Sequence, residues 1–157
     1  MKKILATLLF TAFAMAEGIC GYYLLEKNDE GKEAVAEVFE KDGKYYAYGI
    51  INSDGTYSQD VNNPDDKLKG RSLKGVVFMW GLEKDGDEWD DGKIYNTSNG
   101  KTYSASAKLE GDILKVKATF WGIGKTLVWK KVSEEQIAPL LANKPTMEEV
   151  LSTIPTK

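Results

Sequence analysis

The chain has 157 residues, one cysteine, no histidine and a formal net charge of −3 at pH 7. The single cysteine excludes an intramolecular disulfide, and the absence of histidine excludes a histidine-based catalytic triad, an imidazole metal ligand and a histidine pH switch. A net-acidic chain with scattered lysines lacks the electrostatic footprint of a protein that binds nucleic acid or anionic lipid.

The first segment, residues 1–16, has the pattern of a secretory signal peptide. Lys2 and Lys3 precede a short apolar run, and Ala14-Met15-Ala16 supplies a small-residue cleavage site. The apolar run is too short to span a bilayer. We therefore expect an exported chain, periplasmic or secreted, whose net charge falls from −3 to −5 when Lys2 and Lys3 are removed.

Cys20 follows closely after this segment. A lipoprotein with Cys20 as the lipidated residue is disfavoured, because Ile19 stands where a small residue is expected. We expect Cys20 to be a small buried side chain in the first strand. An intermolecular disulfide or a mixed thiol is the alternative.

Short apolar runs separated by Gly, Asp and Asn follow, as is typical of an antiparallel all-β domain. Asp42-Gly43, between two such runs, is a strong hairpin signal. Eight up-and-down strands can close into a barrel, which is either filled by its own side chains or holds one small ligand. The sequence predicts eight strands in this meander order, at residues 18–26, 33–41, 44–52, 76–84, 88–96, 101–110, 113–121 and 125–132.

Alternation of polar and apolar residues assigns one face of several strands to the barrel interior. The predicted inward sets are Tyr103, Ala105, Ala107 and Leu109; Leu114, Val116, Ala118 and Phe120; and Val76, Phe78, Trp80 and Leu82. The alanines leave room that aromatic side chains can line. The predicted ligand-binding residues are Phe78, Trp80, Tyr95, Tyr103, Phe120 and Trp129, joined by Tyr46 and Tyr48. Simple core packing is the alternative for each of them.

The tail, residues 133–157, is predicted to be helical. Ser133 to Gln136 and Thr146 to Glu149 both have the capping-box pattern, so two short helices are expected. Pro139 is expected to break or kink the first. Their apolar side, which should pack on the barrel wall or close one end, consists of Ile137, Leu140, Leu141, Met147, Val150, Leu151 and Ile154. The domain prediction is thus a signal peptide at 1–16, a barrel at 17–132 and a packed tail at 133–157.

Acidic residues cluster in 85–96, but neither a metal site nor an active site is predicted there. The cluster begins like a calcium-binding loop, but three positions do not fit. Trp89 occupies the fifth position, Asp90 stands where the sixth-position glycine is required, and Asn96 replaces the terminal glutamate. Paired carboxylates for glycoside hydrolysis are equally unsupported, because the acids fall in predicted turns. From the sequence we therefore expect no metal site, no cofactor and no enzymatic activity.

Four stretches of the chain, residues 60–75, 80–105, 114–118 and 125–132, form a recognisable ordered pattern. In these stretches the chain resembles the small exported bacterial proteins grouped as domain of unknown function 2147. The resemblance covers about residues 21–132, and it implies a lipocalin-like barrel and no established reaction. Its most specific element is the ordered set Trp89, Gly92, Ile94, Tyr95, Gly100, Lys101, Thr102 and Tyr103.

The chain departs from this family at two positions. Members usually carry Gly-x-Trp in the first strand and an Arg after the last Trp, and these residues meet at the closed end. This chain has Tyr23 and Lys131 there, which are candidates for a weaker cation–π contact.

The long loop 59–75 carries motif residues of the family. Asp and Asn side chains can bond nearby backbone N–H groups while Pro and Gly set the turns, so a self-capped loop is expected. Leu68 and Leu73 could plug it into the barrel mouth. Three roles are therefore open for the loop: a purely structural one, a lid over the barrel mouth, or a surface that contacts another protein. The residues concerned are Asp60, Asn62, Asn63, Pro64, Leu68 and Leu73.

Taken together, these features predict an exported lipocalin-like protein that binds a small hydrophobic or partly aromatic molecule without catalysis. Tyr hydroxyl and Trp N–H groups would orient the polar end of that ligand. The alternative is a secreted or periplasmic protein-interaction or envelope-associated module with a packed barrel, whose partner binds the 59–75 loop or the terminal helices. No nucleic acid and no membrane span are expected.

Overall fold

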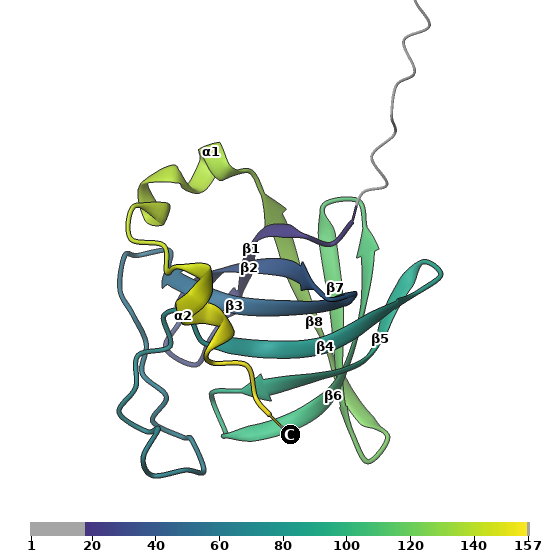
Figure 1. Cartoon of the computed structure of the whole chain (residues 1–157), viewed down its shortest axis with the longest axis horizontal. Coiled ribbons are helices and arrows are strands. Elements are labelled where there is room, and N and C mark those ends of the chain that lie inside the picture. The colour runs from purple at the N-terminus through teal and green to yellow at the C-terminus, as the bar shows by residue number, and fades with distance from the viewer. Residues whose placement is uncertain (1–17, 157) are drawn as a thin grey trace, which may run out of the picture.

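A computed structural model describes residues 18–156, which form a closed antiparallel barrel with a helical tail (Figure 1). Each strand pairs with the next, and β8 pairs back with β1. The predicted eight-stranded up-and-down barrel is therefore confirmed. The predicted signal peptide lies outside the described residues. The strands are β1 (Gly21–Lys27), β2 (Glu33–Lys41), β3 (Lys44–Asn52), β4 (Val77–Asp85), β5 (Glu88–Asn96), β6 (Lys101–Glu110), β7 (Ile113–Phe120) and β8 (Ile123–Val132).

Two tight hairpins show how sequence sets the turns. Asp42 and Gly43 both have positive φ, 52° and 78°, as the predicted Asp-Gly turn requires. Trp121 (φ 52°) and Gly122 (φ 75°) form a second such turn between Phe120 and Ile123. The sequence prediction ended β7 at Trp121 and began β8 at Lys125. It was wrong at this turn because Trp-Gly is not the usual Asn-Gly or Asp-Gly signal.

The barrel interior contains the main hydrophobic core. The predicted inward sets of β6 and β7 are confirmed except at Phe120, which is 53% exposed. Gly92 shows how tightly the interior is packed: the pairing of β5 with β6 shifts just before it, and a Cβ at Gly92 would lie 2.5 Å from Cδ2 of Leu82. The buried core residues are Ile19, Tyr23, Val38, Ala47, Met79, Leu82, Trp89, Ile94, Ala105, Ala107, Leu114, Val116 and Trp129.

The tail contains α1 (Glu134–Ile137), a 3-10 turn η1 (Ala138–Leu141) and α2 (Met147–Leu151). Both predicted capping boxes are present, with Ser133 and Thr146 as N-caps. Pro139 lies at the start of η1, so it ends α1 after one turn, as predicted.

A second hydrophobic cluster lies between this tail and the outer face of the barrel, where α2 crosses in front of β3 and β4 (Figure 1). Ile137 and Val150 are buried there, whereas Met147, which was predicted to belong to the apolar side, is 42% exposed. The barrel contributes Val35, Tyr48, Ile50 and Val77 as buried members of the cluster, with Tyr22, Leu24, Phe39, Tyr46, Ile51, Trp80 and Val132 partly buried.

Polar contacts fix the same tail to the barrel. The backbone N–H of Val77 donates to Oγ1 of Thr153 (2.9 Å). Lys144 forms an ion pair with Glu37 (2.9 Å) and donates to the hydroxyl of Tyr22 (2.9 Å). Burial lowers the pKa of Lys144, but these hydrogen bonds outweigh it, so the pKa is raised overall and the ammonium stays charged. The tail is thus part of the folded domain.

Two predictions for the N-terminal region were wrong. Cys20 precedes β1 and is exposed, because Ile19 takes the buried position. Tyr23 and Lys131 are paired across β1 and β8, but Tyr23 packs against Trp129 and donates to the carbonyl of Ile19 (2.7 Å). Lys131 donates to the carbonyl of Gly18 instead (3.2 Å), so the cation–π contacts of the described residues do not include this pair.

Candidate functional site: a cavity at the open end of the barrel

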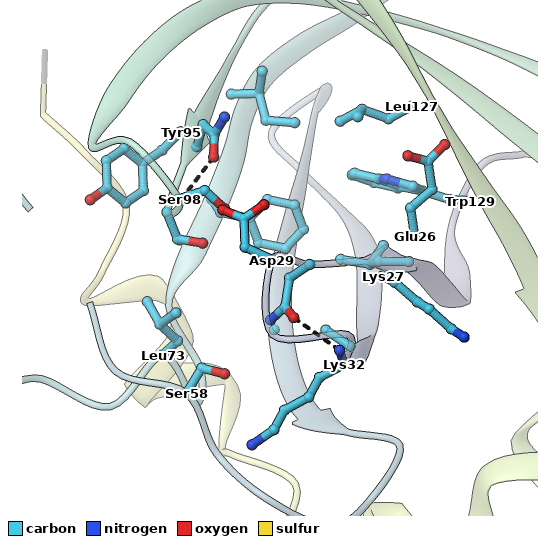
Figure 2. Close-up of a pocket in the computed structure, with 18 of the residues that line it drawn as sticks. Glu26, Lys27, Asp29, Lys32, Ser58, Leu73, Tyr95, Ser98, Leu127 and Trp129 are labelled. Atoms are coloured by element: carbon cyan, nitrogen blue, oxygen red, sulfur yellow. Dashed lines mark hydrogen bonds between the residues drawn. The ribbon is translucent and has the colours of Figure 1, made fainter. Parts of the chain in front are cut away.

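The two ends of the barrel differ. We call the end with the short turns 42–43, 86–87 and 111–112 the packed end, and the other the open end. A cavity of about 570 Å³ opens at the open end, within the range of small-molecule sites. Leu127 and Trp129 lie on one side of this cavity, and Ser58, Leu73 and Tyr95 on the other (Figure 2). Its apolar lining includes Leu25, Phe78, Ile94, Tyr103, Ala118, Leu127 and Trp129.

Aromatic rings form the floor of the cavity. Trp129, only 2% exposed, meets Phe78 edge to face at 5.6 Å and Tyr23 at 6.4 Å. Such edge-on contacts add to the energy of burial and fix ring orientation. Tyr23 lies below Trp129, and burial raises the pKa of its phenol, which keeps it as a neutral hydrogen-bond donor. The floor is therefore rigid and apolar.

Small residues create the space above the floor. Gly49, Ala118 and Gly124 line the cavity. Ala118 was predicted to leave room, and it does so, whereas Ala105 and Ala107 are packed within the core. The cavity thus depends on the small side chains near the mouth rather than on those in the middle of β6.

Charged side chains surround the mouth. Lys27, Lys74 and Lys125 line it, together with Glu26 and Asp29. Glu26 accepts a hydrogen bond from the backbone N–H of Val128 (2.8 Å), while Lys74 lies over the ring of Tyr57 at 5.5 Å. Among the described residues, neither Lys27 nor Lys125 forms an ion pair. Their ammonium groups can therefore meet a polar group on a ligand.

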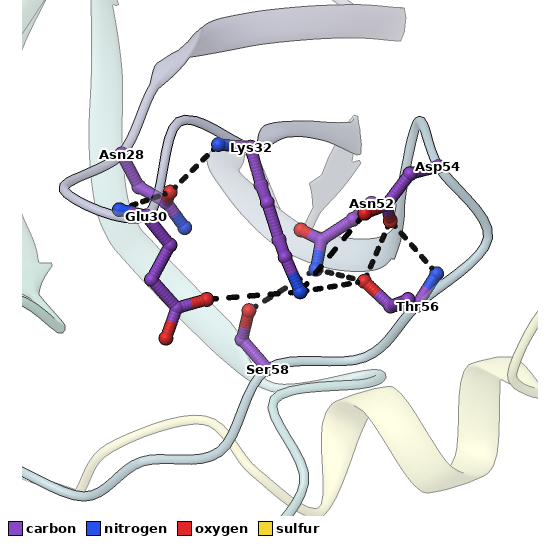
Figure 3. A network of polar contacts seen from close by, with 7 residues as sticks. All are labelled: Asn28, Glu30, Lys32, Asn52, Asp54, Thr56 and Ser58. Carbon is purple, nitrogen blue, oxygen red and sulfur yellow. Dashed lines mark hydrogen bonds and ion pairs between the residues drawn. The ribbon is translucent and has the colours of Figure 1, made fainter.

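Lys32, also at the mouth, is engaged in a polar network that joins the β1–β2 and β3–β4 connections (Figure 3). Its Nζ donates to Oγ1 of Thr56 (3.0 Å), which in turn donates to Asp54 (2.6 Å). Hydrogen bonds from Thr56 hold the pKa of Asp54 below its usual value. Asn52 donates to Oγ1 of the same threonine (3.2 Å). This network sets the shape of one side of the mouth.

The long 59–75 loop is organised by Asp60, which is fully buried. Its carboxylate accepts from Nε of Arg71 (2.9 Å), from Nδ2 of Asn63 (2.7 Å) and from the hydroxyl of Tyr95 (2.7 Å). Burial and the bond to Asp60 raise the pKa of Tyr95. A buried carboxylate is tolerated only when it is paired and hydrogen-bonded, and Asp60 meets both conditions.

The same loop is fixed to the β5–β6 turn. Nδ2 of Asn62 donates to the carbonyls of Thr97 (3.0 Å) and Ser98 (3.1 Å). Only glycine fits at position 100, because a Cβ there would overlap the carbonyl oxygen of Asn62. The predicted self-capping is present at Asn63, which accepts from the backbone N–H of Asp65 (2.8 Å). The role of the loop as a lid stays a prediction.

The remaining loop residues differ in position. Leu73 lines the cavity, whereas Leu68 is half-buried within the loop and does not, so only one of the two predicted plugs reaches the mouth. Pro64 is exposed and lies beside Gly100.

Of the predicted ligand-binding aromatics, Phe78, Tyr95, Tyr103 and Trp129 line the cavity. Tyr95 presents its ring, since its hydroxyl binds Asp60. Tyr103 accepts a hydrogen bond from Asn99 (2.8 Å), so its hydroxyl lies at the β5–β6 turn. The cavity wall thus brings these four together as predicted.

The inward prediction was wrong for the other four. Trp80 belongs to the outer cluster, because the β3–β4 register shifts around Phe78 and Gly81 and thereby reverses the alternation. Tyr46 and Tyr48 also lie in the outer cluster, where Tyr48 donates to Glu37. Phe120 lies at the exposed β7–β8 turn, packed against Tyr103 at 6.0 Å.

Sequence reasoning missed Leu127, Ile94 and Lys125 as lining residues. For Leu127 and Lys125 a signal existed: they alternate with Trp129 along β8, so placing Trp129 inward places them inward too. Within residues 18–156 no three metal-binding side chains of the Asp, Glu, Cys or His type gather at one point, and no helix is long and apolar enough to cross a membrane.

Comparisons with known proteins agree with this geometry. The family model described as an uncharacterized protein conserved in bacteria (DUF2147) matches residues 21–131. A solved structure, described as protein HP1028 from the human pathogen Helicobacter pylori and as belonging to the lipocalin family, is 38% identical. The match covers 88% of this chain and 99% of that one, with a TM-score of 0.79. Among curated proteins no match was found.

Proposed function

We propose that this chain, which belongs to the bacterial DUF2147 family and has a lipocalin-type barrel, binds a small hydrophobic or partly aromatic molecule in its cavity and releases it unchanged. The observation that carries the proposal is the aromatic-floored cavity of about 570 Å³ at the open end. Filling such a preformed apolar space removes apolar surface from water without first having to open the core.

The mouth supports a ligand with one polar end. The floor around Trp129 and Phe78 offers no charge, whereas Lys27 and Lys125 lie at the rim. A ligand would therefore enter with its apolar part first and leave its polar part near these ammonium groups. No catalytic step is part of the proposal, and of the rim carboxylates Glu26 is already bonded to the backbone N–H of Val128.

The signal-like N-terminal segment makes export part of the same proposal. A carrier that works outside the cytoplasm would meet its ligand in the periplasm or the medium. The competing function, a protein-interaction module with a packed barrel, is disfavoured by the volume of the cavity.

The test is a titration with N-phenyl-1-naphthylamine, a probe that becomes fluorescent in apolar surroundings. We expect saturable binding of one probe per barrel. Ala118→Leu places extra carbons in the cavity and should weaken binding about tenfold or more, since overfilling a site costs on the order of 1–3 kcal/mol. Ala138→Leu, on the exposed surface of η1, is the matched control and should leave the affinity unchanged.

Two results would overturn the proposal. One is fluorescence that rises without saturation, which indicates adsorption to the surface. The other is a saturable signal that Ala118→Leu leaves unchanged while the variant remains folded by circular dichroism, because such a probe does not occupy the cavity.

A further inference from the structure

The turn between β7 and β8 exposes large apolar side chains. Phe120 is 53% exposed, Ile123 80% and Trp121 88%. These three residues, which we call the hairpin tip, extend from the lower edge of the barrel in light green (Figure 1). Adjacent exposed apolar side chains of this size usually mark a contact surface.

The fold itself does not require tryptophan at this tip. Trp121 has a φ of 52°, a conformation that is unfavourable for bulky residues and is normally occupied by Asn or Asp in this turn. Its ring packs edge-on against Phe120 at 6.1 Å, yet almost all of it remains in water. The side chain is therefore poorly explained by the stability of the hairpin and well explained by a contact outside the chain.

The strands that lead to the tip are rich in lysine, and four of these lysines lie toward the open end. Residues 92–131 contain eight lysines and only two carboxylates, although the whole chain is net acidic. The net charge of the whole chain, which argued against binding to anionic lipid, does not show this local excess of lysine. Both carboxylates, Glu110 and Asp112, lie at the packed end, where Lys115 pairs with Glu110 and Lys108 with Glu88.

The lysines on the open-end halves of β5 to β8 are exposed. Lys93 lines a shallow hollow together with Phe120 and Trp121, and the side chain of Lys117 passes within reach of Gly124, beside the tip. Among the described residues, the exposed open-end lysines of β5–β8 form no ion pair; they are Lys93, Lys101, Lys117 and Lys125.

We propose that the hairpin tip docks on an anionic lipid surface, with Trp121 and Ile123 in the interfacial layer and the neighbouring lysines on the headgroups. Tryptophan prefers the membrane interface, and each lysine near an anionic leaflet adds attraction. Ile123, Gly124 and Lys125 also line the cavity, so docking brings its mouth onto the lipid. The docking itself does not depend on what the cavity binds.

Co-sedimentation with vesicles tests this proposal. The protein is expressed with its own N-terminal segment, and mass spectrometry determines where the purified chain begins. Every variant must begin at the same residue, so that differences in vesicle binding come from the substitution. Equimolar phosphatidylglycerol and phosphatidylcholine vesicles should bind it, and phosphatidylcholine vesicles should bind it much more weakly. Trp121→Asn should lower the affinity for the anionic vesicles about tenfold or more, and it suits the turn, so the variant should fold.

A pair of charge reversals separates docking from general attraction. Lys117→Glu, near the tip, should weaken vesicle binding several-fold, with about tenfold as the upper range. Lys130→Glu is the matched control, because it makes the same change of charge on the exposed face of β8 at the packed end, and it should have little effect.

Three results would overturn the proposal. The wild type does not bind anionic vesicles; Trp121→Asn binds them as tightly as the wild type; or analytical ultracentrifugation finds self-association that Trp121→Asn abolishes while vesicles are ignored. The last result would assign the tip to a second copy of the chain. The vesicle experiment does not involve the naphthylamine probe. A failure to bind vesicles would therefore overturn docking of the tip but would leave ligand binding in the cavity to be tested by the probe titration.

Discussion

The two ends of the barrel are built from the same strands but differ in how closely their side chains pack. At the packed end Leu114, Tyr23 and Ile19 are fully buried, and several surface lysines pair with carboxylates on neighbouring strands, as Lys44 does with Glu83. At the open end a cavity of about 570 Å³ lies between the strands and the mouth loops, and β7 and β8 expose apolar side chains with lysines beside them. We therefore expect the packed end to contribute most of the stability, while the open end is available for contacts.

The largest effect should come from the packed end. Leu114→Ala removes a fully buried side chain that does not line the cavity, so the free energy of unfolding should fall by about 2–5 kcal/mol. Leu127→Ala, at the half-buried cavity wall, should cost about 1 kcal/mol, because part of that side chain already faces open space. Urea unfolding measures both, and equal losses would break the comparison between the two ends.

The 59–75 loop should respond next. Asp60→Ala leaves Arg71 and Tyr95 without their shared acceptor, which should cost about 1–3 kcal/mol and speed amide exchange in the loop. Hydrogen-exchange mass spectrometry reads this directly. Asp66→Ala, which removes only an exposed ion pair with Lys69, is the control and should change stability by less than about 1 kcal/mol. Unchanged exchange in the Asp60 variant would show that Asp60 does not hold the loop.

The hairpin tip should show the opposite sign. Trp121→Asn replaces a bulky residue at positive φ with one that the turn favours, so stability should stay level or rise by up to about 1 kcal/mol. Thermal unfolding is the measurement. A clear loss of stability would mean that Trp121 is needed for folding, which would weaken the case for a contact outside the chain.

Alkaline pH should affect both the loop and the outer cluster, while the neutral range should have little effect. Burial, with hydrogen bonds to Glu37 and Asp60, raises the pKa of Tyr48 and Tyr95 above the ordinary value of 10. Their contribution is fully present below the unfolded value near pH 10 and is lost as pH rises through the folded values. Urea midpoints should therefore stay flat from about pH 7 to 9 and fall above about pH 10. Tyr95→Phe should reduce that fall; an unchanged fall would assign it to other groups.

The fold could be predicted from the sequence because local signals agreed along the chain. Asp42-Gly43 marked a hairpin, Ser133 and Thr146 marked helix starts, and the alternation of β6 fixed its inward face. The site was predicted only in part, for a physical reason. Tyr46 and Tyr48 lie on a strand that is apolar on both faces, since the C-terminal tail covers its outer face, and periodicity cannot choose between two buried faces.

Trp80 was predicted on the wrong face of its strand, and Trp121 was predicted at the end of a strand rather than in the turn, each for another reason. An irregular register in β4 reversed the alternation at Trp80, and no pattern of polar and apolar residues announces a bulge in advance. At Trp121 the turn is formed by a residue type that disfavours it. Asp60 was recognised only as a residue of the 59–75 loop. Its hydrogen bond to Tyr95 joins positions 35 apart in sequence, so no local pattern predicts it.

Native mass spectrometry of the protein recovered from an exporting bacterial host, with organic extraction of anything bound, tests the central claim most directly. We expect a discrete adduct of one small molecule per barrel that is absent from Ala118→Leu and retained by Ala138→Leu. A clean apo mass, unchanged after the protein is exposed to a mixture of lipids and apolar small molecules, would contradict the claim that the open end is a binding site.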